Sequence, residues 1–190
     1  MRCVALVGVA LLTAACQMRD PYVSLSDTTR SGAWQIDRQT DRVTGATLPS
    51  AATMGTASSS NDPYPRWAQL QLTCFEKQPL VRFAFAFKVG SDKNSTLGYR
   101  FDDKPGHDSA NSRILTGYTV AVIEDRAEVI RFVEELATSQ ILYVRIRSLN
   151  AGRTSAEFKL DGAPAAIAAG FADCPPTSPP PQPQPSRRTA

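Results

Sequence analysis

Alternating apolar and polar residues dominate the central part of the chain. Every second side chain is apolar at 69–74 and again at 81–89, and the second run carries three phenylalanines on its apolar side. A period of two places one face of a β-strand against a core. Because a polar turn at 76–79 separates the two runs, they predict an antiparallel hairpin with one buried aromatic face.

The same alternation recurs along the rest of the domain. We expect further strands at residues 34–38, 97–102, 118–123, 142–146 and 156–160, the last two joined by a turn at 150–152. Ser, Ala, Thr and Pro fill residues 50–65, a composition that favours a long surface loop.

Two helices interrupt the strands. Residues 126–138 carry one apolar stripe, and Asp125 followed by Glu128 has the spacing of a capping box. A short closing helix is entered by Pro164 and runs toward Cys174. The pattern predicts an α+β fold: one antiparallel β-rich domain over residues 32–174, with sandwich-like sheet packing, one amphipathic helix and a closing helix.

The N-terminus has the features of an export signal. Arg2 precedes an almost wholly apolar run over residues 4–12, which is too short to span a bilayer and is typical of a signal peptide over residues 1–15. The segment Leu12-Thr13-Ala14-Ala15-Cys16 resembles a bacterial lipobox. The resemblance implies cleavage before Cys16, a diacylglycerol on its sulfur and, because Gln17 is not Asp, sorting to the periplasmic side of the outer membrane. Ordinary cleavage, with Cys16 left as a thiol, is the alternative.

Two polar segments flank the domain. Residues 16–31 have no sustained period, so we expect an acylated tether. Residues 175–190 hold seven of the 14 prolines, which predicts an extended, disordered tail. The tail is either solvated chain or a peptide ligand for a partner.

Cysteine usage predicts one disulfide. Cys3 lies in the signal peptide and Cys16 is the lipidation site, which leaves Cys74 and Cys174. The periplasm is oxidising, so a Cys74–Cys174 bridge is expected, with two buried thiols as the alternative.

Composition limits the chemistry. With 21 Lys and Arg against 18 Asp and Glu, the chain lacks the basic surplus of a nucleic-acid-binding protein. One His and scattered cysteines predict no metal site, and no glycine-rich phosphate loop is present, so we expect no cofactor.

The residue types of a hydrolase triad occur together at His107, Asp108 and Ser109. A triad needs partners that converge from separate segments, so we expect no catalytic residue here. The hypothesis of a hydrolase that uses the His107 loop is kept as an alternative.

A cationic strand face is the candidate binding site. Tyr143, Arg145 and Arg147 alternate with apolar residues. The paired N–H donors of an arginine guanidinium suit carboxylates and phosphates. The candidate binding residues are Tyr99, Arg100, Asp102, Tyr143, Arg145 and Arg147. The competing interpretations are neutralisation of this face by Glu157 and an internal ion pair between Arg100 and Asp102.

Several short motifs resemble one known family. They are Trp34, Cys74, the Tyr99-Arg100-Phe101-Asp102 run, the strand around Arg145, the segment Phe158-Lys159-Leu160-Asp161-Gly162 with Ala166-Ile167, and Cys174. Together they resemble the periplasmic accessory proteins of type VI secretion systems, the TagO- or VasI-like family. The resemblance implies a non-catalytic envelope protein that acts near peptidoglycan during assembly of a secretion machine.

These observations favour a lipid-anchored accessory lipoprotein that binds an envelope protein or a cell-wall component such as peptidoglycan. The alternatives are the hydrolase and a structural lipoprotein that acts through its proline-rich tail.

Overall fold

The computed structural model describes residues 23–176. The predicted signal peptide, Cys16, and the proline-rich tail after residue 176 lie outside the described residues. Within 23–176, neither helix combines the length and the hydrophobicity that a bilayer crossing requires.

The described chain forms ten strands, two α-helices and one short 3-10 helix. In chain order they are β1 (Val23–Ser31), β2 (Trp34–Asp41), β3 (Thr47–Ser59), β4 (Asp62–Phe75), β5 (Gln78–Phe85), η1 (Asp92–Asn94), β6 (Ser95–Phe101), β7 (Arg113–Ile114), β8 (Val120–Ile123), α1 (Arg126–Leu136), β9 (Ile141–Ser148), β10 (Gly152–Lys159) and α2 (Ala163–Gly170).

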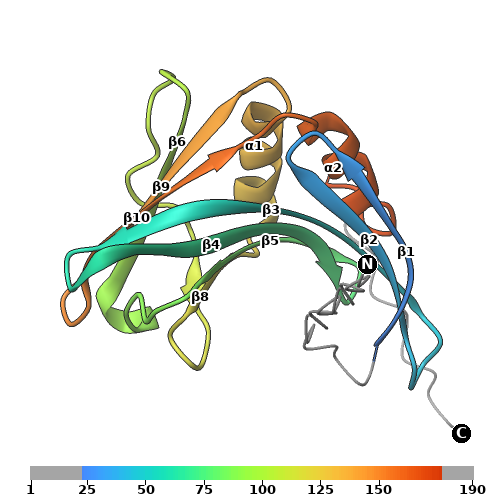
Figure 1. The fold of residues 1–190 in the computed structure, drawn as a ribbon, viewed down its shortest axis with the longest axis horizontal. Helices are drawn as coiled ribbons and strands as arrows, with labels where there is room; N and C mark the ends of the chain where they lie inside the picture. Colours follow the sequence, from blue (N-terminus) through green and yellow to red (C-terminus); the bar gives the residue numbers. More distant parts are fainter. Residues whose placement is uncertain (1–22, 177–190) are drawn as a thin grey trace, which may run out of the picture.

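All ten described strands belong to one antiparallel sheet in the order β6-β9-β10-β3-β4-β5-β8-β7, with β1 and β2 as a side branch. The branch exists because two strands share the same side of β3: residues 47–53 of β3 pair with β2, and residues 55–59 pair with β10. Figure 1 shows the sheet curving beneath α1. The β-rich α+β prediction is confirmed, and one curved sheet takes the place of the two facing sheets of a sandwich.

Helix α1 packs between β5 and β6, two strands that lie far apart in the order of the sheet. Its fully buried Phe132 has its ring centroid 6.0 Å from that of Phe83 on β5 and 5.0 Å from that of Phe101 on β6. The Asp125 side chain accepts a 3.0 Å hydrogen bond from the Glu128 amide, as the capping box predicts. The helix ends at Leu136, two residues before the predicted end.

Helix α2 packs beside β2, β3 and β4, and the chain beyond it carries the predicted disulfide. Cys74 at the end of β4 is bonded to Cys174, with their Cα atoms 6.0 Å apart. The bridge therefore joins the end of the domain to the β4–β5 hairpin, and the disulfide prediction is confirmed.

The predicted loop at 50–65 is wrong, because these residues belong to two long paired strands, β3 and β4. The inward positions of β3 are small: Ala51, Thr53, Gly55 and Ala57. A Cβ on Gly55 would collide with the Phe158 ring and the Glu157 carbonyl, so the missing side chain at Gly55 allows β3 to pair with β10 and the Phe158 ring to pack against it.

The described part of the predicted tether also differs from the expectation. Residues 23–31 form β1, which pairs with β2 from Val23↔Asp41 to Ser31↔Trp34. The strand is stabilised by backbone hydrogen bonds, and its described side chains from 27 to 30 are exposed, so no apolar alternation marks it in the sequence.

Candidate functional site

The predicted cationic face lies on the outer side of β6 and β9, turned away from α1. Along β9, Leu142, Val144 and Ile146 are buried, while Tyr143 and Arg147 are exposed and Arg145 is partly exposed. Register pairs Arg100 with Tyr143 across the two strands. We call Arg100, Tyr143, Arg145 and Arg147 the arginine face.

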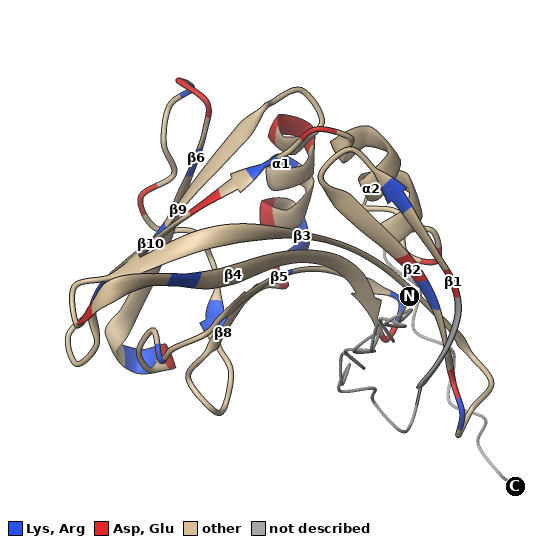
Figure 2. Cartoon of the chain, viewed as in Figure 1, with Lys and Arg blue, Asp and Glu red and all other residues tan. Residues whose placement is uncertain are grey.

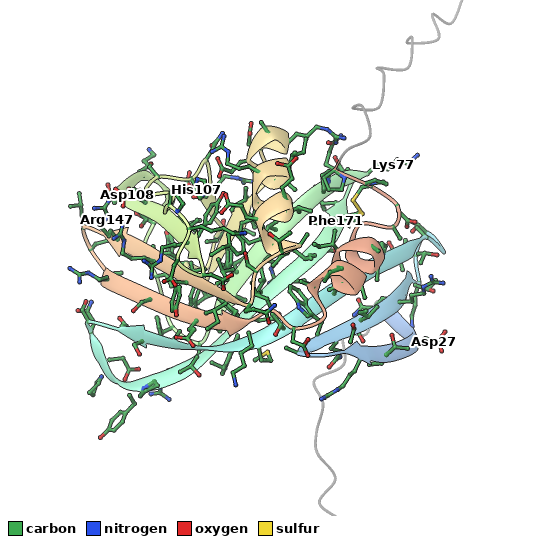
Figure 3. The ribbon with its side chains drawn as sticks, turned by 90° about the horizontal axis from the view of Figure 1, so that it is seen from above. Asp27, Lys77, His107, Asp108, Arg147 and Phe171 are labelled. Atoms are coloured by element: carbon green, nitrogen blue, oxygen red, sulfur yellow. A yellow bond between two sulfur atoms is a disulfide. The ribbon has the colours of Figure 1, made fainter. Side chains whose placement is uncertain are left out.

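Two kinds of contact organise the arginine face. The Arg100 guanidinium lies over the Tyr143 ring, 5.2 Å from its centroid, in a cation–π contact. Arg145 and Arg147 both bind the carboxylate of Asp108, and the Arg147 contact measures 2.9 Å. Figure 3 shows Asp108, His107 and Arg147 together at one end of the molecule, far from Asp27.

Asp108 reaches the arginines because the loop after β6 folds back along that strand. Tyr99 and His107 exchange two backbone hydrogen bonds of 2.9 and 2.8 Å, and the Ala110 amide donates to the Leu97 carbonyl. The loop passes close to Gly98, where a Cβ would lie only 2.9 Å from the His107 carbonyl oxygen. The absence of a side chain at Gly98 therefore permits the crossing.

His107 faces the other side of the sheet from Asp108. Its ring stacks on Tyr99 with centroids 4.5 Å apart, and its Nε2 lies 2.6 Å from Glu135 Oε1 on α1. His107 and Asp108 therefore serve different partners, and they do not assemble into a triad with Ser109. Figure 2 shows acidic residues on α1 and a basic residue on β6.

The expectation that Glu157 neutralises this face is wrong for Arg145. In the β9–β10 register Glu157 lies opposite Tyr143, and Arg145 lies opposite Ser155. The counter-ion is Asp108, from a loop, and strand periodicity gave no signal for it. The Arg145 Nε is buried without a hydrogen-bond partner in the described residues, so one donor of this guanidinium is unused.

Tyr99 and Asp102 do not belong to the arginine face. Tyr99 is buried, and its hydroxyl donates a 2.7 Å hydrogen bond to Glu128 Oε1. Burial, followed by the bond to Glu128, raises the pKa of the Tyr99 hydroxyl above its usual range.

Asp102 holds the start of β9. Its carboxylate accepts hydrogen bonds from the backbone amides of Gln140 at 3.0 Å and Ile141 at 2.8 Å. The ion pair with Arg100 is therefore not formed, because Asp102 has a left-handed backbone (φ 45°) and turns toward the β9 backbone.

No metal centre is evident in residues 23–176, where no three His, Cys, Asp or Glu side chains converge. What the arrangement offers chemically is a pair of arginines that already hold one carboxylate, beside a tyrosine covered by a third arginine. Guanidinium groups have the geometry and charge to bind carboxylates and phosphates.

Comparison with known proteins gives no relative: no family model, no curated protein and no solved structure matches this chain. The resemblance to type VI secretion accessory proteins therefore stays a prediction. Its most distinctive run, Tyr99 to Asp102, has a structural role in the fold, because it supplies the bond to Glu128, a buried phenylalanine and the cap on Ile141.

Proposed function

We propose that this chain is a lipid-anchored, non-catalytic accessory protein of the bacterial cell envelope that captures an anionic partner through the arginine face. The observation behind this proposal is the position of Asp108, whose carboxylate is bound by both Arg145 and Arg147. The carboxylate or phosphate of a ligand could make the same two contacts. Because the Asp108 side chain is 68% exposed, a ligand can reach and displace it.

The proposed location rests on other features. The lipobox-like sequence at Cys16, followed by Gln17 rather than Asp, supports a protein anchored on the periplasmic side of the outer membrane. The Cys74–Cys174 disulfide fits an oxidising compartment. A role in type VI secretion is part of the proposal through the residues that resemble that family.

Titration of the purified protein with anionic probes tests the arginine face. We expect an oligoglutamate or an oligogalacturonate to bind, and the double variant Arg145→Gln/Arg147→Gln to lose about tenfold or more in affinity, since two charge-assisted contacts disappear. Arg113→Gln is the matched control, because Arg113 pairs with Glu124 outside this face.

Asp108→Asn should act in the opposite direction. Removing the internal carboxylate frees both guanidinium groups, and an exposed pair is worth up to about 1 kcal/mol, so affinity should rise up to about fivefold. Asp103→Asn, an exposed change in the same loop, should leave affinity unchanged. The proposal fails if neither probe binds, or if binding does not depend on Arg145 and Arg147.

A further inference from the structure

Three hollows on the outer face of the sheet meet at one residue. They have volumes of about 740, 1050 and 560 Å³, and Ser155 on β10 lines all of them. The third contains Arg100, Tyr143 and Arg145, and the second contains Arg147, so the arginine face is part of a longer groove. We call the three hollows together the outer groove.

The floor of the outer groove carries hydroxyl groups. Ser155 on β10 lies directly opposite Ser58 on β3, and the neighbouring outward position of β3 is Thr56. Each hydroxyl offers one donor and two acceptor sites. Such a floor suits a ligand with many hydroxyl groups of its own.

An aromatic side chain stands at each end of one row across the strands. The register runs from Tyr143 to Glu157, then to Thr56, then to Trp67. Tyr143 is 36% exposed and Trp67 is 50% exposed. Three strand spacings separate them, or about 14 Å at 4.8 Å each. Trp67 lines none of the three hollows but pairs with Thr56, which lines the first of them, so it lies beside the groove and only an extended ligand can contact both aromatic side chains.

The central strands beneath the groove are paired on both sides: β9 with β6 and β10, and β10 with β9 and β3. β6 is the edge strand, and the loop that follows it already hydrogen-bonds to that edge at Leu97 and Tyr99. A peptide that adds a strand needs an unpaired edge, whose backbone groups supply the affinity. Recognition on this face therefore falls to side chains: hydroxyls, aromatic rings and guanidinium groups.

Charge selects among hydroxyl-rich ligands. Seven Lys and Arg line the three hollows, against two acidic residues, Asp108 and Glu157. The excess of positive charge favours a ligand that carries carboxylates.

We infer that the outer groove binds an extended acidic polysaccharide, whose carboxylates contact Arg145 and Arg147 and whose sugar rings stack on Tyr143 and Trp67. A sugar ring presents an apolar face to an aromatic side chain and hydroxyls to the serines at its edge. This inference rests on the proposed function and names its ligand class.

Calorimetric titration of the full mature protein in detergent tests the inference with three probes: an oligogalacturonate, a neutral malto-oligosaccharide of equal length and an oligoglutamate. We expect the oligogalacturonate to bind most tightly. Trp67→Ala and Tyr143→Ala should each weaken it about tenfold, the loss expected when an aromatic side chain that contacts the ligand is removed. Phe75→Ala removes an aromatic side chain that is 66% exposed at the β4–β5 turn, away from the groove, and should have no effect.

Tryptophan emission gives an independent readout, because the chain has two tryptophans and Trp34 is fully buried. The oligogalacturonate should shift the emission of the wild type but not that of Trp67→Ala. Equal or tighter binding of oligoglutamate, or full affinity in Trp67→Ala, overturns the polysaccharide while leaving anion capture intact. Failure of every anionic probe overturns the proposed function as well.

Discussion

The hydroxyl of Tyr99 on β6 donates a 2.7 Å hydrogen bond to Oε1 of Glu128 on α1, inside the interface that closes the core. Glu128 is only 6% exposed, and its other oxygen lies 3.4 Å from Arg131. A buried carboxylate of this kind depends on its donors, because removal of one leaves a desolvated charge underpaired.

Tyr99→Phe should therefore destabilise the domain by about 1.5–3 kcal/mol, the range for a hydrogen bond to a charged group. Urea unfolding measures the change in the free energy of unfolding. Tyr118→Phe is the control, because Tyr118 is 47% exposed. Equal stabilities of the two variants would show that the Tyr99–Glu128 bond contributes nothing.

Alkaline pH should weaken the fold through the same residue. The pKa of Tyr99 is raised in the folded state, so its stabilising effect is complete below the unfolded pKa of about 10 and declines as pH rises above it. Unfolding free energies from about pH 9 to about pH 11 should fall more steeply for the wild type than for Tyr99→Phe. Parallel curves would contradict this.

Reduction of the Cys74–Cys174 bridge should lower stability by about 4–5 kcal/mol, from the chain entropy of a loop of this length. The paired variant Cys74→Ser/Cys174→Ser should unfold at lower urea whether or not a reductant is present. Thiol titration of the unreduced mature protein should find no free thiol from this pair. Two titratable thiols would exclude the bridge.

Strand periodicity predicted the aromatic hairpin, the β9–β10 pair and the outward position of Arg145, because each of these strands has one buried face. It could not find β1, whose side chains from 27 to 30 are exposed, or β3, whose buried side is made of small residues. In both strands pairing with a neighbour, rather than large apolar side chains, determines the conformation.

Sequence reasoning also located four of the six candidate binding residues on one face, and misplaced Tyr99 and Asp102. Tyr99 follows the alternation of its strand into the core, where Glu128 accepts its hydroxyl. The role of Asp102 depends on a left-handed backbone, which the sequence pattern does not reveal. Asp108 reaches the arginine face only because its loop folds back over β6. Trp67 lies in the same cross-strand row as Tyr143 only because of the strand register.

Substitution of Cys16 should release the protein from the membrane. Each acyl methylene buried in a bilayer contributes about 0.8 kcal/mol, so the proposed diacylglycerol on Cys16 would be the main attachment to the membrane. In Cys16→Ser we expect loss of palmitate labelling and partition into the aqueous phase of a detergent extraction. A membrane-bound Cys16→Ser protein would contradict lipidation at this residue.

Gly98 on β6 and Gly106 in the loop that folds back over β6 offer a matched pair of substitutions, because both lie where the loop passes the strand. A Cβ at Gly98 would lie 2.9 and 3.0 Å from the carbonyl oxygens of His107 and Asp108, whereas at Gly106 the nearest atom is 3.7 Å away. The His107 carbonyl accepts a hydrogen bond from the Tyr99 amide on β6 and has little room to move, so Gly98→Ala should cost about 1–3 kcal/mol, as overpacking does.

Gly98→Ala should also displace Asp108 and speed hydrogen exchange at the His107 and Ala110 amides, while Gly106→Ala leaves both unchanged. Because loss of the Asp108 contact frees Arg145 and Arg147, the same substitution should increase the affinity for an anionic probe even as it destabilises the fold. Unaltered exchange in Gly98→Ala would show that the loop does not depend on the missing side chain.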